Sequence, residues 1–182
     1  MSIGEEVILV VDFGSQYAHL IARRIRELKV YSEIVFPDIS VNEIQKISPK
    51  GIILSGGPRS VYEKDAPLLS DDVFNFIVDN NIPILGICYG HQLIASKMGG
   101  EVKGEKKKEY GIATVDILDS EGIFNGLGKE ETVWMSHGDQ VSRIPKDFVI
   151  SSKTDTCQVA AFRSTSKKIY GLQWHPEVVH TK

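Results

Sequence analysis

The feature that most constrains the fold is a repeated alternation of buried strand and amphipathic helix in the first half of the sequence. Val7 to Val11 is an unbroken apolar run, which is typical of a strand buried on both faces. Apolar residues recur at helical spacing from Tyr17 to Leu28, and we expect Ser15 to be the N-cap of this helix. Strand–helix–strand connections join parallel strands. The sequence therefore predicts an α/β fold with a central, mostly parallel sheet flanked by helices.

The alternation continues as far as residue 98, and the pattern then changes. Ser40 and Glu43 fit a capping box, and Ser70 is placed to cap a further helix. The later half is rich in strands, and no Pro/Gly-rich linker divides the chain, so we expect a single domain over residues 1–182. Strands are predicted at Glu33 to Phe36, Gly51 to Leu54, Pro83 to Ile87, Gly111 to Leu118, Thr132 to Ser136, Phe148 to Ser152, Val159 to Phe162 and Ile169 to Trp174, with a helix near His91 to Met98.

The composition narrows the possible partners. The 182 residues are 42% hydrophobic and 25% charged, as in an ordinary folded domain. A net charge of -3 gives no general attraction to nucleic acid or to anionic membranes, so we expect neither as a partner. The start of the chain lacks the basic and apolar regions of a signal peptide, and we expect a cytoplasmic protein. Two cysteines are too few for a disulfide framework, and no metal site is expected.

A glycine-flanked cysteine stands where the strand Pro83 to Ile87 gives way to a helix. Gly86-Ile87-Cys88-Tyr89-Gly90 has the form of a nucleophile elbow, in which small residues let the strand and helix approach. At the helix N-terminus a thiolate is favoured, and the N–H of Tyr89 is placed to face the oxyanion that attack creates. Cys88 is therefore predicted to be a nucleophile. A buried cysteine in a tight turn is the alternative.

A second motif follows the apolar run that begins at Ile169. In Gln173-Trp174-His175-Pro176-Glu177, His175 is expected at the edge of the sheet that carries the chemistry. A thiol nucleophile needs an imidazole that takes its proton, and the imidazole needs a partner that fixes its tautomer. We predict His175 as the base and Glu177 as its partner, with Pro176 stiffening the segment. A turn with an exposed histidine and a solvated glutamate is the alternative.

Two further segments and one glutamine offer binding groups. Ser55-Gly56-Gly57-Pro58 presents glycine amides, and Gly57 is predicted as the second oxyanion donor. This loop lacks the ending of a Walker phosphate loop, and a plain turn is the alternative. Trp134 to Asp139 is predicted to join a strand to a polar loop that holds the two ends of an amino acid, unless it is an ordinary Gly-Asp turn. Gln92 is predicted to reach the amino-acid group of the substrate.

The remaining polar residues have structural interpretations. His91 has no carboxylate near it in the sequence, and Cys157 lies beside an apolar strand, so both are expected to be structural. A lysine-rich stretch also contains glutamates, which favours a solvated hairpin over a contact with a partner. Its residues are Lys103, Glu105, Lys106, Lys107, Lys108 and Glu109.

Taken together, these motifs resemble the class I, triad-type glutamine amidotransferases. The elbow extended to His91-Gln92, the Ser-Gly-Gly-Pro loop and the His-Pro-Glu ending occur in the order of that family and span almost the whole chain. The resemblance implies a flavodoxin-like core with a nucleophile elbow. The site residues that it implies are Cys88, His175 and Glu177 as the triad, Gly57 and Tyr89 as oxyanion donors, and Gln92, Ser136, His137, Gly138 and Asp139 as glutamine-binding residues.

Three segments are similar to the amidotransferase part of GMP synthetases in particular: Asp12 to Tyr17, Ser55 to Tyr62 and Met135 to Asp139. This resemblance implies that L-glutamine is the substrate and that its ammonia passes to an ATP pyrophosphatase subunit or domain. ATP, Mg²⁺ and XMP are expected in that partner, and no cofactor is expected in this chain. The Ser-Gly-Gly-x-Asp-Ser loop of the pyrophosphatase does not occur here, so the chain is either a separate glutaminase subunit or part of a fused enzyme.

Two other functions stay open from the sequence. A stand-alone γ-glutamyl hydrolase, or a different amidotransferase, would use the same triad without depending on this partner. A regulatory or binding subunit would retain the fold without turnover, although the intact Cys88, His175 and Glu177 argue against it.

Overall fold

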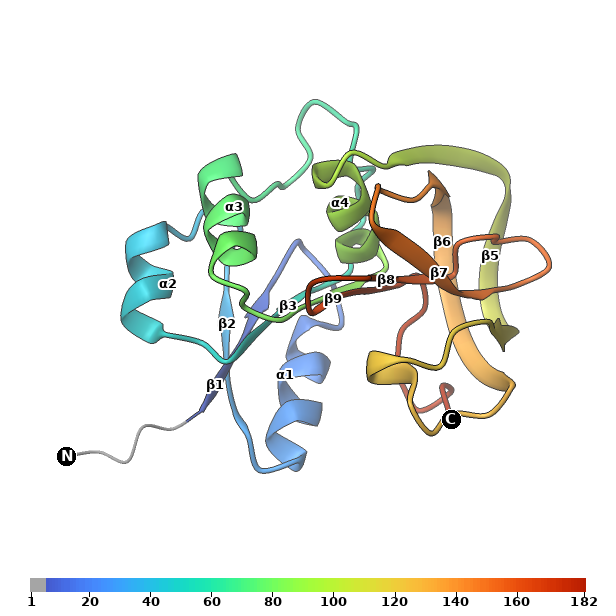
Figure 1. Cartoon of the computed structure of the whole chain (residues 1–182), viewed down its shortest axis with the longest axis horizontal. Coiled ribbons are helices and arrows are strands. Elements are labelled where there is room, and N and C mark those ends of the chain that lie inside the picture. Colours follow the sequence, from blue (N-terminus) through green and yellow to red (C-terminus); the bar gives the residue numbers. More distant parts are fainter. Residues whose placement is uncertain (1–5) are drawn as a thin grey trace.

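The computed structural model describes residues 6–182, except for the side chains of residues 105–107. Within this range the chain forms four α-helices and a nine-stranded sheet of order β2-β1-β3-β4-β9-β8-β7-β5-β6 (Figure 1). The elements are β1 (Val7–Val11), α1 (Ala18–Glu27), β2 (Tyr31–Val35), α2 (Val41–Ile47), β3 (Gly51–Leu54), α3 (Asp71–Asp79), β4 (Ile84–Ile87), α4 (Tyr89–Lys97), β5 (Glu101–Ile117), the 3-10 turn η1 (Gly122–Phe124), β6 (Glu130–Arg143), β7 (Phe148–Lys153), β8 (Ala161–Ser164) and β9 (Ile169–Leu172).

One half of the sheet is parallel, as the strand–helix alternation predicts. β1 pairs with β2 and β3, β3 pairs with β4, and β4 pairs with β9, all in parallel. Successive residues of β1 pack on opposite faces of the sheet, with Leu9 and Val11 in one core cluster and Val10 in another. All three are buried, which explains why this strand has no polar positions.

The helices cover both faces of the parallel half. Ile21 and Ala22 of α1 pack with Val10, whereas buried residues of α2, α3 and α4 pack with Leu9 and Val11. Figure 1 shows α1 on the opposite side of the strands from α2 and α3. None of the helices within residues 6–182 has the length and apolar character needed to cross a membrane.

Two of the three predicted helix caps are confirmed. Ser40 and Glu43 form the capping box of α2, and the Ser70 side chain accepts from the Val73 N–H at the start of α3. The prediction for Ser15 was wrong, because α1 begins at Ala18. The Ser15 hydroxyl instead accepts from the N–H of Tyr17 at 3.0 Å, so it shapes the loop between β1 and the helix.

The other half of the sheet is antiparallel, so the sheet as a whole is mixed. After α4 no helix lies between β5, β6, β7, β8 and β9 in the part of the chain that the structure describes, apart from the single turn η1. Without a helical crossover, neighbouring strands run in opposite directions. The pairings β5–β6, β5–β7, β7–β8 and β8–β9 are all antiparallel.

Two predictions in this half were wrong. The lysine-rich stretch is not a hairpin, because it lies within the 17-residue strand β5. The register with β6 shifts there, since Gly104 pairs with Asp139 whereas Glu109 pairs with His137. Nor does the segment around Ser136 join a strand to a loop, because it lies inside β6. Pairing across the two long strands outweighs the local preference of Gly and Asp for turns.

Candidate active site

The Cys88 backbone has the strained conformation expected of a nucleophile elbow. Cys88 follows β4 and precedes α4, with φ 51° and ψ -103°. Non-glycine residues rarely adopt positive φ, and such strain costs about 1–3 kcal/mol. Two hydrogen bonds hold the turn: the Cys88 N–H donates to the Leu172 carbonyl at 2.7 Å, and the Gly90 N–H donates to the Ser55 carbonyl at 3.0 Å.

The glycines on either side of Cys88 are required by close backbone approaches. A Cβ on Gly86 would lie 2.4 Å from the carbonyl oxygen of Gly90. A Cβ on Gly90 would lie 2.2 Å from the carbonyl oxygen of Leu54. Both distances are too short for any side chain, so β3, β4 and α4 can meet here only with glycine at both positions.

His175 and Glu177 form a buried pair at the end of β9. The Nδ1 of His175 and the Oε1 of Glu177 are 2.7 Å apart, and both residues are buried. Their main chain is also held, because the Arg24 guanidinium donates to the Glu177 carbonyl at 3.0 Å and the Thr181 hydroxyl donates to the His175 carbonyl at 2.6 Å. The pair therefore has one fixed orientation, with Nδ1 of the imidazole engaged.

The charge of His175 depends on its two neighbours. Burial alone would lower the pKa of this imidazole, but the hydrogen bonds and charges of Cys88 and Glu177 outweigh burial and raise the pKa to about 10. His175 is therefore protonated at neutral pH.

Cys88 and His175 meet at Gly56. A Cβ on Gly56 would lie 3.2 Å from Cε1 of His175 and 3.7 Å from Cβ of Cys88. The absence of a side chain at Gly56 thus leaves the space between the two groups open. On another side of His175, the ring of Tyr17 packs edge-on at a centroid distance of 5.3 Å.

Cys88 and His175 line a cleft of about 620 Å³. The two predicted oxyanion donors, Gly57 and Tyr89, line it. A Cβ on Gly57 would lie 2.9 Å from the Phe13 carbonyl oxygen, so this position also needs glycine. The residues around the cleft are Gly14 to Tyr17, Gly57 to Ser60, Cys88, Tyr89, Gln92, Gly104, Lys108, Tyr110, Ser136 to Asp139 and His175.

Comparison with known proteins identifies the family. The sequence model of the class I glutamine amidotransferases matches residues 9–182. The chain belongs to the class I glutamine amidotransferases.

Curated relatives of this amidotransferase domain are longer proteins. The glutamine-hydrolysing GMP synthase of Brachyspira hyodysenteriae is 50% identical over 175 residues, which cover 96% of this chain and 33% of that enzyme. The GMP synthase of Caldanaerobacter subterraneus subsp. tengcongensis is 50% identical over 181 residues, which cover 100% of this chain and 35% of that enzyme. The chain spans about a third of the length of these relatives.

Solved structures of related proteins have the same fold. A Thermoplasma acidophilum protein, described as one of the subunits of a GMP synthase, superposes with a TM-score of 0.88 at 40% identity, over 98% of this chain and 87% of that one. A glutamine amidotransferase of Thermotoga maritima superposes with a TM-score of 0.79 at 23% identity, over 96% of this chain and 77% of that one. The second likeness concerns the fold alone.

The five residues predicted to bind glutamine all line the cleft of the amidotransferase domain. The Ser136 carbonyl accepts from the Cys88 thiol at 3.5 Å, and the Asp139 carboxylate accepts from the Tyr62 hydroxyl at 3.1 Å. The amide nitrogen of Gln92 donates to the Asp139 carbonyl at 2.9 Å. The strand β6 thus brings its central residues directly to Cys88.

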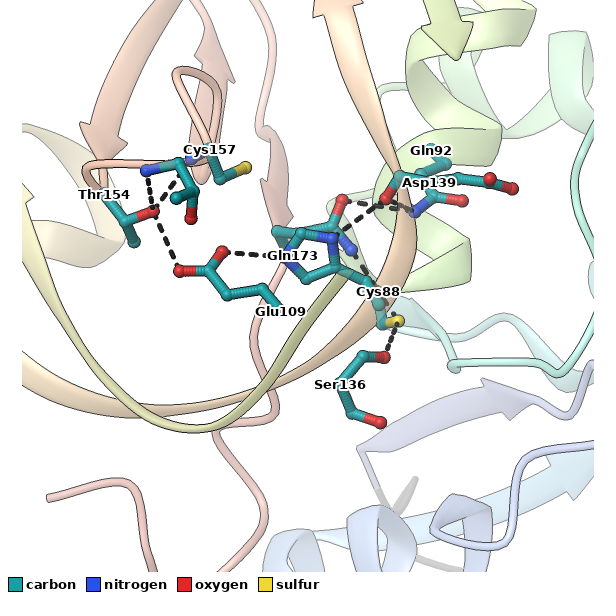
Figure 2. A network of polar contacts seen from close by, with 10 residues as sticks. Cys88, Gln92, Glu109, Ser136, Asp139, Thr154, Cys157 and Gln173 are labelled. Atoms are coloured by element: carbon teal, nitrogen blue, oxygen red, sulfur yellow. Dashed lines mark hydrogen bonds and ion pairs between the residues drawn. The ribbon is translucent and has the colours of Figure 1, made fainter. Parts of the chain in front are cut away.

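The imidazole of His137 is engaged by protein groups. Its Nδ1 lies 3.1 Å from the Asp139 carbonyl oxygen and its Nε2 lies 3.1 Å from a carboxylate oxygen of Glu109. The other carboxylate oxygen of Glu109 accepts from the Thr154 hydroxyl at 3.1 Å (Figure 2). Burial lowers the pKa of His137, although Glu109 opposes this effect. The prediction of a solvated Glu109 was therefore wrong: its partners are remote in sequence.

Glu109 and His137 also belong to a potential metal-binding group. With Cys157 they bring one oxygen, one nitrogen and one sulfur atom within 4.8 Å of one another. A metal ion there would have to replace the hydrogen bond between Glu109 and His137. The expectation that this chain binds no metal stays a prediction.

His91 has the structural position that the sequence predicted. It is fully buried and stacks on Phe162 at a centroid distance of 4.4 Å. Burial lowers the pKa of His91 to about 3, despite the opposing effect of the Gly171 and Val159 backbones. The ring is neutral at physiological pH and packs within the core.

The lysine-rich stretch is split between the surface and the cleft. Lys103 pairs with Glu101 at 3.3 Å, whereas Lys108 lines the cleft and its aliphatic chain lies against Gly138. The side chains of Glu105, Lys106 and Lys107 lie outside the described residues.

The sequence motifs predicted no role for Gln173, although its side-chain amide nitrogen donates to the sulfur of Cys88 at 3.7 Å. Its position two residues before His175 was the available signal.

Proposed function

We propose that this chain is the glutaminase part of a GMP synthase. It hydrolyses L-glutamine to glutamate and ammonia through a thioester on Cys88, and the ammonia passes to an ATP pyrophosphatase subunit or domain that converts XMP to GMP. The observation that carries the proposal is the 2.7 Å His175–Glu177 pair, whose imidazole lines the same cleft as the strained Cys88. The names of the relatives support the choice of acceptor.

Acylation begins with the Cys88 thiolate, which attacks the side-chain carbonyl carbon of glutamine. The electron pair of the carbonyl moves to oxygen, where the N–H groups of Gly57 and Tyr89 stabilise the oxyanion. The carbon–nitrogen bond then breaks as the His175 imidazolium gives its proton to the leaving nitrogen. Ammonia departs, and the glutamyl group remains on sulfur as a thioester.

Deacylation reverses the proton transfers. The neutral imidazole of His175 takes a proton from water as the water oxygen attacks the thioester carbon. The oxyanion forms again at the same two amides, the carbon–sulfur bond breaks, and glutamate leaves. Glu177 holds Nδ1 of His175 throughout, which keeps one tautomer and stabilises the imidazolium. The resting thiolate–imidazolium pair is regenerated.

Recognition of the amino-acid end of glutamine is assigned to the β6 segment. A free amino acid carries an ammonium group and a carboxylate, so it needs an acidic partner and hydrogen-bond donors. Asp139 supplies the carboxylate, and the backbone of Ser136 to Gly138 and the amide of Gln92 supply the polar surroundings. All of these residues line the cleft around Cys88.

The reaction that consumes the ammonia would take place in the pyrophosphatase partner. ATP and Mg²⁺ would bind in the pyrophosphatase, where XMP is adenylated before ammonia attacks it, and this chain would hold neither. A single domain over residues 1–182 and a cytoplasmic location are the remaining parts of the proposal.

The two cysteines of the chain provide a matched test of the nucleophile. In Cys88→Ala, release of glutamate from L-glutamine should fall by about 10³-fold or more, because no other group can form the thioester. In Cys157→Ala the rate should stay within a few-fold of wild type, since Cys157 is buried in a core cluster with Val133 and Trp174. Both variants are assayed with a GMP synthase pyrophosphatase domain, XMP and ATP. Hydrolysis that survives in Cys88→Ala would contradict the proposal.

The same assay separates the alternatives. A stand-alone hydrolase would reach its full rate without the pyrophosphatase and without XMP. A binding subunit would hydrolyse no glutamine, and its Cys88 would not react with a glutamine-like diazo-ketone. The proposal predicts covalent labelling of Cys88 by that reagent and GMP formation only when both parts are present.

A further inference from the structure

Gln173 makes a buried contact with the sulfur of the nucleophile. It follows β9 directly, and its exposed fraction is 0%. Its amide nitrogen donates to the Sγ of Cys88 at 3.7 Å, which is within reach for a sulfur acceptor. The neighbouring main chain is pinned, because the Gln173 N–H donates to the Ala160 carbonyl at 2.8 Å and the Leu172 carbonyl accepts from Cys88.

The orientation of the Gln173 amide is set by Gln92. The amide nitrogen of Gln92 donates to the Gln173 side-chain oxygen at 3.2 Å and to the Asp139 carbonyl at 2.9 Å. Figure 2 shows this chain of contacts running from Asp139 through Gln92 and Gln173 to Cys88. A flipped Gln173 amide would put its NH₂ group against the NH₂ group of Gln92. Its N–H group is therefore directed at the sulfur.

Besides the titratable imidazole of His175, which interacts with Cys88, the sulfur has two partners that do not titrate and that prefer different charge states. The Ser136 carbonyl, 3.5 Å from Sγ, can only accept, so it favours the protonated thiol. The Gln173 amide N–H can only donate to sulfur, so it favours the thiolate. An amide does not titrate, and its contribution is present at every pH at which the fold is intact.

We propose that Gln173 is a positioning residue. Its amide N–H stabilises the Cys88 thiolate and holds Sγ beside the Ser136 carbonyl, at the wall of the cleft. The role of Cys88 as nucleophile rests on the proposed function, but its thiolate can be measured without glutamine. Gln173 is not among the residues that line the cleft. It therefore contacts the sulfur, whereas the substrate would be contacted by the residues that line the cleft.

The test is the pH profile of Cys88 alkylation by iodoacetamide, a small neutral reagent that reacts with the thiolate, followed at Cys88 by mass spectrometry. In Gln173→Met, which removes the donor, the midpoint should rise by about one pH unit, and the rate at a pH below both midpoints should fall about tenfold, as expected for loss of one hydrogen bond to a charged group. Gln173→Glu should shift the midpoint at least as far, because its carboxylate repels a thiolate. Gln45→Met, on the exposed side of α2, is the control and should match wild type.

Two further measurements keep the outcome decisive. Near-ultraviolet circular dichroism reports whether each variant is folded. If Gln173→Met unfolds, the test uses Gln173→Glu, which keeps the acceptor for Gln92 and the shape of the side chain. In glutamine hydrolysis kcat should fall with little change in KM. Folded variants whose alkylation midpoints equal that of wild type would overturn the proposal. If the chain hydrolyses no glutamine at all, the proposed function fails while the alkylation shift still decides the role of Gln173.

Discussion

Burying an imidazole ordinarily disfavours its charged form, yet His175 is buried and its pKa rises to about 10. The reason lies in two residues: Glu177 lies 2.7 Å from Nδ1 of the ring, and the interactions of the ring with Cys88 and Glu177 both favour its charged form. At the residue scale the site therefore contains a buried His175–Glu177 ion pair that the fold holds together. The protonation state of His175 should therefore affect the unfolding free energy of the protein.

The predicted consequence is a pH-dependent unfolding free energy. A base whose pKa is higher in the folded state than in the unfolded state stabilises the fold fully below its unfolded pKa. For His175 this contribution should be complete below pH 6.5 and lost as the pH rises to about 10. Urea unfolding across this range should show a steeper loss in wild type than in His175→Asn. His19→Asn, at an exposed position of α1, is the control, and equal slopes in wild type and His175→Asn would refute the prediction.

At the scale of elements, the elbow depends on three segments that touch without side chains between them. β3, β4 and α4 converge where Gly86 and Gly90 face the backbone of their neighbours. The glycine pattern was sufficient to predict a strand-to-helix turn at Cys88. It was not sufficient to identify Leu54 of β3 as the third contact, because that residue is distant in sequence.

This convergence gives a prediction about stability. Gly86→Ala would place a methyl group 2.4 Å from the Gly90 carbonyl oxygen, and the elements would have to separate. The unfolding free energy should fall by about 3 kcal/mol or more, measured by urea denaturation. Gly128→Ala is the matched control, because its nearest contacts are at 3.4 Å or more; its effect should stay within about 0.5 kcal/mol. A Gly86→Ala variant as stable as that control would disprove the close approach.

At the scale of the whole molecule, the cleft lies where the two halves of the sheet meet. Cys88 and His175 follow the parallel neighbours β4 and β9, whereas β6 is the last strand of the antiparallel half. The antiparallel half nevertheless reaches back to the proposed triad, since the His175 N–H donates to the Trp134 carbonyl at 3.0 Å and Cys88 contacts Ser136. A change in the position of β6 would therefore move both the residues proposed to bind glutamine and the surroundings of Cys88.

From this arrangement we predict control by the proposed pyrophosphatase partner. We predict that the isolated chain hydrolyses glutamine slowly, and that adding the pyrophosphatase with XMP and ATP raises the rate at least roughly tenfold by ordering the segments around Gly57 and Ser136. Glutamate release is measured with each component omitted in turn, and Cys88→Ala with all components is the blank. A full rate from the chain alone would contradict this prediction.

The sequence by itself determined the local features of this protein: the buried strands, the capped helices, the elbow at Cys88 and the His-Pro-Glu segment. Each depends on residues close together along the chain, where periodicity and turn chemistry are informative. Tertiary structure decided what no local pattern contains. It made the segment around Ser136 part of a strand, placed Glu109 against His137, and brought Gln173 to the sulfur of Cys88. The last two contacts join residues 28 and 85 positions apart.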